Sequence, residues 1–311
     1  MNIRKSIFFI FYFNLVYLTG SGVGINENQN MEVENKRFQV ELLSVTGSPK
    51  FEIVLKVLEK TSGLIKTVMI DDMFSRFQSV EKLILVPVDK VCVQGHLPRG
   101  GRIISIIDLN TYSLIDTLWI NRELSFSPSF QFFVYLSYAP KFIPRGFSSV
   151  VLLYDLSKSP NENRLTEHSN VENGGIPIFP RENAMAKSYS PLLAGGGTGY
   201  TSPFLWSEDE SKIVFLHVQR ERNSPANKRN NYITAVDISR GVMSPEITKR
   251  EINIEEYIDV SKQTSSIAAR IKNKSFSLWA NGLEWFGEEL VKIDLSNVGI
   301  YGHDYLILNV P

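Results

Sequence analysis

Residues 202–215 read SPFLWSEDESKIVF, and after a polar loop residues 232–239 read YITAVDIS. The order of residue types predicts a turn, an inner strand, a loop and an outer strand that ends in an acidic turn. Aromatic and β-branched residues fill the two expected strands, and Ser, Asp and Glu fill the turns. This stretch therefore predicts one small antiparallel sheet.

Weaker copies of the same pattern recur along the chain. In each copy, apolar strand formers lead into an aspartate whose carboxylate we expect to cap the backbone of the following turn. The five aspartates are Asp71, Asp108, Asp155, Asp237 and Asp294. Most steps between them approach the roughly 40–50 residues of one β-propeller blade, but the step from Asp155 to Asp237 is about twice as long. We assign the excess to an insertion at residues 159–201, because this segment is mostly polar and rich in Gly, Asn and Pro.

The recurrence predicts an all-β fold, a β-propeller of roughly five to six four-stranded blades. One blade is too small to bury its own two faces, whereas blades stacked side by side bury them against each other. We place the propeller at residues 37–311, with the insertion inside it. Apolar runs at residues 38–43, 51–58 and 83–88 fit further strands, and the nearest helical candidate is the short segment 261–272.

A second phrase precedes two of the copies and carries a family resemblance. It reads WSED at residues 206–209 and FSPS at residues 126–129, and each time an apolar run follows after a short spacer. The pattern resembles the blade repeat of TolB-type and WD40-like β-propellers, in which a Trp-Ser-Pro-Asp-Gly turn precedes an inner strand. The first copy keeps Trp206, Ser207 and Asp209.

The resemblance is incomplete in both copies. Glu208 and Glu210 stand where the family usually has Pro and Gly, and Ser129 and Phe130 replace Asp-Gly in the other copy. The resemblance implies a fold and brings no catalytic residues with it.

The N-terminus has the three parts of a secretory signal peptide. Arg4 and Lys5 precede an apolar core at residues 7–18, which is shorter than the roughly 20 residues needed to span a bilayer, and small residues follow. We therefore predict a cleaved signal peptide at residues 1–24 and a loose leader at residues 25–36, with a retained anchor as the alternative. The protein is then exported, periplasmic or secreted, with no stable membrane span after cleavage.

Composition limits the class of partner and the means of stabilisation. Lys plus Arg equals Asp plus Glu, at 33 each, so the basic excess usual in nucleic-acid-binding proteins is missing, although a local basic patch remains possible. Cys92 is the single cysteine, which excludes an intramolecular disulfide and a zinc site built on several thiolates. Its apolar surroundings favour a buried hydrophobic role. We predict a monomer without a cofactor or metal.

The sequence offers little catalytic chemistry. No Gly-x-Ser-x-Gly nucleophile motif occurs, and His96, His168, His217 and His303 lack the spacing of a metal site. We expect His217 to be a packed core residue, and the neighbouring His303 and Asp304 to be the best polar candidates. The carboxylates of residues 208–210 fit a solvated turn, with calcium as the alternative.

These observations favour a module that binds a protein, peptide or glycan through loops on one face, since function in repeat folds resides on loops. The apolar motif at residues 174–180 would either plug the central channel or cover an open sheet edge. A secreted hydrolase or lyase with a site at the channel, and a structural accessory of an envelope complex, are the alternatives. The candidate binding residues are Ile176, Phe179, Arg181, Tyr200, Arg220, Arg222, His303 and Asp304.

Overall fold

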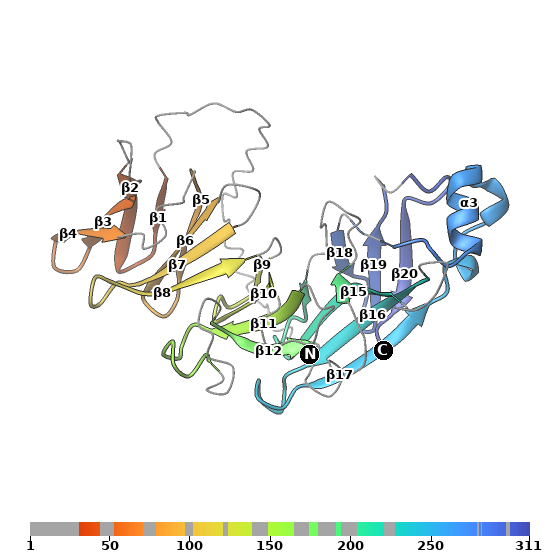
Figure 1. The fold of residues 1–311 in the computed structure, drawn as a ribbon. Helices are drawn as coiled ribbons and strands as arrows, with labels where there is room; N and C mark the ends of the chain where they lie inside the picture. The colour runs from red at the N-terminus through yellow and green to blue at the C-terminus, as the bar shows by residue number, and fades with distance from the viewer. Residues whose placement is uncertain are drawn as a thin grey trace, which may run out of the picture.

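The computed structural model of the chain is built almost entirely of strands (Figure 1). It describes residues 31–43, 53–70, 79–96, 102–120, 124–138, 149–164, 174–179, 191–193, 204–220, 228–278, 280, 282–296 and 299–311. Helical structure in these residues comprises η2 (Ile254–Glu256), η3 (Val260–Lys262) and α3 (Ser265–Lys272). Within the described part, no helix is long and apolar enough to cross a membrane.

The strands form five antiparallel sheets, which we number 1 to 5 along the chain. Sheet 1 contains β1 (Glu32–Glu34), β2 (Phe38–Leu43), β3 (Ile53–Glu59) and β4 (Leu64–Ile70). Sheet 2 contains β5 (Ser79–Val86), β6 (Lys90–His96), β7 (Arg102–Asp108) and β8 (Ser113–Ile120). Sheet 3 contains β9 (Leu124–Phe126), β10 (Phe132–Tyr138), β11 (Ser149–Asp155) and β12 (Ile176–Phe179).

Sheets 4 and 5 depart from this regular plan. Sheet 4 contains β13 (Pro191–Leu193), β14 (Leu205–Trp206), β15 (Lys212–Arg220), β16 (Arg229–Asp237) and β17 (Glu246–Ile252), and both β13 and β14 pair with β15. Sheet 5 has three strands, β18 (Gly282–Trp285), β19 (Leu290–Asp294) and β20 (Tyr305–Asn309). The five described sheets follow one another in an arc, as Figure 1 shows, so the predicted all-β, propeller-type fold of roughly five to six blades is confirmed.

Burial between successive sheets explains the sequence pattern. In β3, Ile53, Leu55 and Val57 are buried and alternate with more exposed residues, because among the described sheets only sheet 2 packs on sheet 1. In β15, Phe215 packs toward sheet 3 and Leu216 toward sheet 5, so the strand reads as a continuous apolar run. Four apolar clusters join sheets 1 and 2, 2 and 3, 3 and 4, and 4 and 5.

Two tryptophans link the first strands of sheets 3, 4 and 5. The Trp206 indole Nε1 donates to the Ser125 carbonyl at 3.3 Å, and the Trp285 Nε1 donates to the Trp206 carbonyl at 2.7 Å. Each tryptophan therefore buries a large ring between two sheets and fixes the position of the neighbouring backbone.

Among the described residues, the long step between Asp155 and Asp237 contains no further sheet, and the insertion at residues 159–201 stays a prediction. Asp155 ends β11 and Asp237 ends β16, which are successive sheets. The insertion is not one irregular loop, however, because β12 and β13 form within residues 159–201. The apolar motif forms β12, the last strand of sheet 3, so it covers the edge of β11 and is not a plug.

The recurring aspartates hold turns, as expected. The Asp108 carboxylate accepts from the backbone N–H groups of Asn110 and Thr111 at 2.8 and 2.9 Å, and Asp237 accepts from Ser239 at 2.8 Å. The hydrogen bonds from Ser239 also lower the pKa of Asp237. Asp294 ends the second strand of sheet 5, whereas the other described aspartates of the repeat end a third strand. The distance from Asp237 to Asp294 therefore does not measure one blade. Asp71 lies outside the described residues.

The N-terminal boundary differs from the expected one. The predicted loose leader at 25–36 includes β1, whose residues Glu32–Glu34 pair with β2. The pairing of Val33 with Val40 explains the difference, since it adds an edge strand that polar composition concealed. The predicted signal peptide lies outside the described residues and stays a prediction.

A buried polar cluster joins sheets 2 and 3. The Asp116 carboxylate accepts from Arg164 Nη2 at 2.6 Å and from the Tyr154 hydroxyl at 2.9 Å. The Tyr135 hydroxyl donates to the Gly174 carbonyl. Burial and the Asp116 carboxylate raise the pKa of Tyr154, so its hydroxyl remains a donor. The cluster therefore fixes the chain on both sides of the connection between β11 and β12.

Replacing Asp116 tests the importance of this cluster. Asp116→Ala leaves the Arg164 cation and the Tyr154 hydroxyl without their buried acceptor, so we expect a loss of about 3–5 kcal/mol in the free energy of unfolding. Asp294→Ala removes only a turn acceptor and should cost about 0.5–1.5 kcal/mol. Urea unfolding of both variants measures the difference, and equal losses would contradict this assignment.

Candidate functional site

The two ends of the sheets have different connections. Because strands pair antiparallel in chain order, the first and third turns of each sheet lie at one end, which we call the turn face. The turn face is formed by residues 35–37, 60–63, 87–89, 109–112, 127–131, 156–164, 207–211, 238–245 and 286–289. At the opposite end, the loop face, β17 connects to β18 through residues 253–281 and β19 connects to β20 through residues 295–304. Figure 1 places α3 at the end opposite the turn between β16 and β17.

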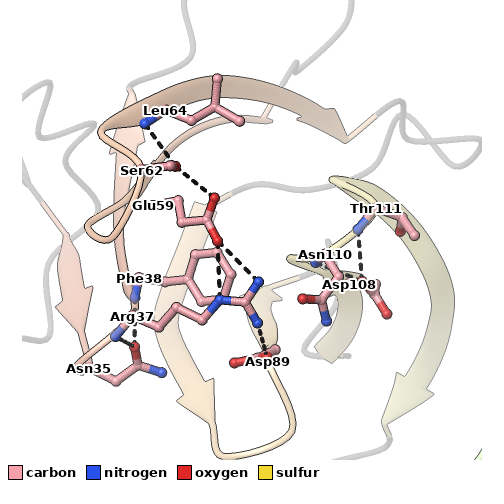
Figure 2. Close-up of polar contacts among 10 residues, drawn as sticks. All are labelled: Asn35, Arg37, Phe38, Glu59, Ser62, Leu64, Asp89, Asp108, Asn110 and Thr111. Carbon is pink, nitrogen blue, oxygen red and sulfur yellow. Dashed lines mark hydrogen bonds and ion pairs between the residues drawn. The ribbon is translucent and has the colours of Figure 1, made fainter.

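Side chains on the turn face bond to each other and to the backbone. Figure 2 shows Arg37 between Glu59 and Asp89, with ion pairs of 3.0 and 2.6 Å. These carboxylates raise the pKa of Arg37, the Glu59 hydrogen bond most strongly. Since Glu59 belongs to sheet 1 and Asp89 to the first turn of sheet 2, Arg37 joins two blades.

The acidic cluster at residues 208–210 also serves the turn face. Asp209 accepts from the hydroxyls of Ser207 and Ser211 at 2.6 and 2.8 Å, and the Ser207 hydrogen bond in particular lowers the pKa of Asp209 to about 2. The Glu210 carboxylate accepts from the Ser129 hydroxyl at 2.7 Å and so links sheets 3 and 4. Within the described residues, no group of three or more His, Cys, Asp or Glu side chains could hold a metal ion. The Asp209 and Glu210 carboxylates are thus engaged by hydroxyl groups of the turn face.

The loop face of sheets 4 and 5 carries the largest described non-strand region. We call residues 253–278 and 299–304 the platform; it contains η2, η3 and α3. Ile254, Ile258, Ile271 and Phe276 pack into the apolar cluster between the two sheets. The side chain of Thr264 caps α3 by accepting from the Ile267 N–H at 3.4 Å. The platform is therefore packed onto the sheets rather than suspended above them.

Two buried amide side chains fasten the platform. Gln263 donates to the Tyr301 carbonyl at 2.9 Å and accepts from the Tyr301 N–H at 2.8 Å. Asn231 in β16 likewise donates to the Phe276 carbonyl at 3.1 Å and accepts from the Leu278 N–H at 2.6 Å. Each amide thus bonds one backbone N–H and one backbone C=O group of a platform segment that is not paired in a strand.

Tyr301 is the most exposed large hydrophobic residue described, with 70% of its surface accessible. Its backbone is fixed by Gln263 and flanked by Gly299 and Gly302, whose φ angles of 77° and 79° lie in the left-handed region. An exposed aromatic on a fixed backbone can enter a partner's pocket at little entropic cost. Sequence reasoning missed Tyr301, although its position beside a glycine in the IYGHD turn was a usable signal.

The predicted binding residues fall into three groups. Ile176 and Phe179 are buried in β12, so neither side chain offers a surface to a partner. His303 is half-buried and Asp304 is exposed on the loop face, where the Asp304 carbonyl accepts from the Leu295 N–H at 2.7 Å. Arg220 ends β15 at the loop face. Arg181, Tyr200 and Arg222 lie outside the described residues.

A histidine–carboxylate pair lies at the loop-face end of sheet 2. His96 Nδ1 is 3.3 Å from Glu81 Oε1, and Glu81 Oε2 accepts from Arg102 Nε at 3.1 Å and Gln94 Nε2 at 2.7 Å. Ser79 stands directly opposite His96 in the strand register. Only the hairpin brings these residues together, so their sequence spacing gave no signal.

His217 is fully buried, which confirms its predicted packed role. Its ring stacks on Tyr232 with centroids 5.0 Å apart and contacts Phe179 at 4.8 Å, and its Nδ1 lies 2.7 Å from Thr234 Oγ1. Its Nε2 has no hydrogen-bond partner within the described residues. Burial therefore lowers the pKa of His217 to about 3, helped by the charge of Lys249.

Comparisons with known proteins add solved structures only, because no family model and no curated protein match the chain. The chain is similar to the β-propeller domain of the Trilobed protease from Pyrococcus furiosus, at 12% identity and a TM-score of 0.35, over 90% of this chain and 67% of that one. It is also similar to a prolyl endopeptidase, at 8% identity and a TM-score of 0.32, over 88% of this chain and 35% of that one.

A third similar structure is a protein from Bacteroides ovatus described as a dipeptidyl aminopeptidase IV. The identity is 10% and the TM-score 0.32, over 68% of this chain and 30% of that one. The chain therefore spans about a third of the length of this protein and of the prolyl endopeptidase. Likeness at this level assigns neither a family nor a function, and the TolB-type and WD40-like resemblance stays a prediction.

The buried His217 predicts a pH-dependent stability. Its pKa falls from an ordinary 6.5 to about 3, so between these values the unfolded chain binds a proton that the folded chain does not. Stability should therefore fall as the pH drops below 6.5, by up to about 1.4 kcal/mol per pH unit from this group.

His217→Phe keeps a ring among Phe179 and Tyr232 and should remove this slope, whatever it costs at neutral pH through the lost Thr234 contact. His303→Phe is the matched control and should retain the slope, because His217 is still present. Urea midpoints of both variants, measured between about pH 7 and about pH 5, give the slope of stability against pH. An unchanged slope in His217→Phe would contradict the assignment.

Proposed function

We propose that this protein is an exported binding module that recognises a protein, peptide or glycan partner through its loop face. The observation that carries the proposal is the difference between the two faces. Turn-face side chains such as Arg37, Asp209 and Glu210 are engaged within and between blades. The loop face instead presents an anchored platform with an exposed Tyr301. Binding residues on loops held by a rigid scaffold are typical of repeat folds.

Export is part of this proposal and rests on the predicted signal peptide at residues 1–24. The properties of Cys92 support it, since burial raises the pKa of this thiol to about 12 and keeps it unreactive. A lone buried thiol tolerates an oxidising compartment, where an exposed one would form mixed disulfides. We propose that the exported chain acts as a monomer.

Paired variants on the two faces test the binding proposal. Deletion of residues 159–201 is unsuitable, because it removes β12 and β13. Tyr301→Ser combined with His303→Ser alters the loop face, and Arg240→Ser combined with Met243→Ser alters the exposed turn between β16 and β17. In a pull-down from the native envelope fraction, we expect only the loop-face variant to lose the partner.

Matched thermal unfolding of both variants controls for folding. A partner retained by the loop-face variant and lost by the turn-face variant would refute the proposal. Equal retention by both would also count against it, because Tyr301 is the most exposed aromatic residue described on the loop face.

A secreted hydrolase is the second candidate, and the pair formed by His96 and Glu81 favours it. No hydrogen bond joins His96 Nδ1 to Glu81, although the two groups are 3.3 Å apart. A small rotation of the ring would give Nδ1 the carboxylate contact that leaves Nε2 available to activate a hydroxyl, and Ser79 stands opposite His96 in the register. In its favour, Glu81 is itself held by Arg102 and Gln94.

A fluorophosphonate probe separates the two candidates. On the binding proposal we expect no labelling of the wild-type chain, measured by intact mass. Labelling that disappears in Ser79→Ala and in His96→Gln, but persists in Ser113→Ala on β8, would establish the hydrolase instead.

A further inference from the structure

The platform brings together two basic segments that are far apart in the sequence. Lys228 and Arg229 stand at the start of β16, and Arg270, Lys272 and Lys274 stand at the end of α3. The Arg229 N–H donates to the Lys274 carbonyl at 2.6 Å, so the two segments are in direct contact. We call these five residues the basic ridge.

Hydrogen bonds fix the ridge in place. Arg229 Nη1 donates to the Ser277 hydroxyl at 2.7 Å, and the Asn231 amide holds the backbone on both sides of Ser277. The Arg270 guanidinium lies 5.3 Å from the centre of the Phe276 ring. The charges are therefore presented from a backbone that is already ordered, which lowers the entropic cost of binding.

Four of the five cations face solvent. Lys228, Arg270, Lys272 and Lys274 are exposed, whereas Arg229 is half-buried and ties the segments together. The chain has no Asp or Glu anywhere in residues 260–283, so no acidic neighbour in that stretch offsets the charge. A balanced whole-chain charge thus conceals a local positive patch.

Helix stabilisation accounts for only part of the ridge. Arg270 and Lys272 lie in the last turn of α3 and complement the negative end of its dipole. Lys228 is not in the helix, and Lys274 follows it with φ 49°, a left-handed backbone that Gly or Asn adopts more readily. Lys274 therefore adds a positive charge at a position where the local conformation does not call for a lysine.

We propose that the basic ridge binds an acidic peptide segment of a protein partner. This inference rests on the proposed loop-face binding function and names the chemistry of the ligand. The flanks of the ridge favour a short acidic segment over an extended polyanion. Glu251 is paired with Tyr232 in the strand register, and Glu255 and Glu256 follow in η2. A long anionic chain would therefore meet exposed carboxylates. Complementary charge would chiefly set the association rate and the choice of partner.

A charge-reversal pair tests the ridge. The probe is a fluorescent peptide with four consecutive glutamates, compared with its glutamine analogue by anisotropy on the exported chain. Lys272→Glu combined with Lys274→Glu should weaken binding of the glutamate peptide at least about fivefold. Lys66→Glu combined with Arg240→Glu changes the net charge equally at exposed sites on β4 and the turn face, and should alter binding less than about twofold.

Lys274→Asn separates binding from folding. Asparagine suits the left-handed backbone, so this variant should be as stable as the wild type or more stable, yet bind the glutamate peptide more weakly. Thermal unfolding and anisotropy on the same sample give both values. Unchanged binding in this variant and in the ridge pair would overturn the proposal.

Other outcomes are equally decisive. Equal weakening by the ridge pair and the control pair would show a net-charge effect and overturn the ridge. Ridge-dependent binding of a heparin fragment or an oligonucleotide that is tighter than peptide binding would replace the acidic peptide with a polyanion. A partner captured through Tyr301 but bound normally by the ridge pair would remove this inference and leave the proposed function intact.

Discussion

Burial of each sheet against the next is the constraint on which the structure depends. A single small sheet has two faces and cannot cover either, whereas stacking buries both faces of its middle strands. Phe215 and Leu216, adjacent in β15, pack into different clusters for this reason. Trp206 also fixes how neighbouring sheets are placed. Its ring packs between sheets, and its indole and carbonyl groups hydrogen-bond to the strands on either side.

The stacking of the sheets determines how polar groups at the two ends of the sheets find hydrogen-bond partners. At the turn face, short turns bring carboxylates, hydroxyls and Arg37 of neighbouring blades within hydrogen-bond distance, so the face holds itself together. At the loop face of sheets 4 and 5, the described parts of the connections contain no strand. Buried Asn231 and Gln263 take over, each bonding the N–H and C=O groups of a connection. The platform is thereby anchored where it touches the sheets, while residues such as Tyr301 stay exposed.

Buried ionisable groups follow the same rule of compensation. Asp116 is retained between sheets 2 and 3 because Arg164 and Tyr154 both bond to it. Within the described residues, His217 hydrogen-bonds to Thr234 and its Nε2 has no partner. Burial lowers its pKa, so we expect the folded state to lose stability in acid. Both groups stabilise the junctions of blades, and neither stands on the surface where a partner would bind.

The sequence by itself determined the strand-rich repeat and the turn role of aspartates such as Asp237, because local residue types encode turns and alternation. Only the tertiary structure decided that residues 174–180 complete sheet 3, since an apolar run does not reveal which edge it will cover. The sequence did not reveal the candidate sites either, because their residues meet only in the folded chain. His96 and Glu81 meet through strand register, and Arg229 and Lys274 meet through the docking of α3. Contacts between residues distant in the chain depend on global packing, which no local pattern records.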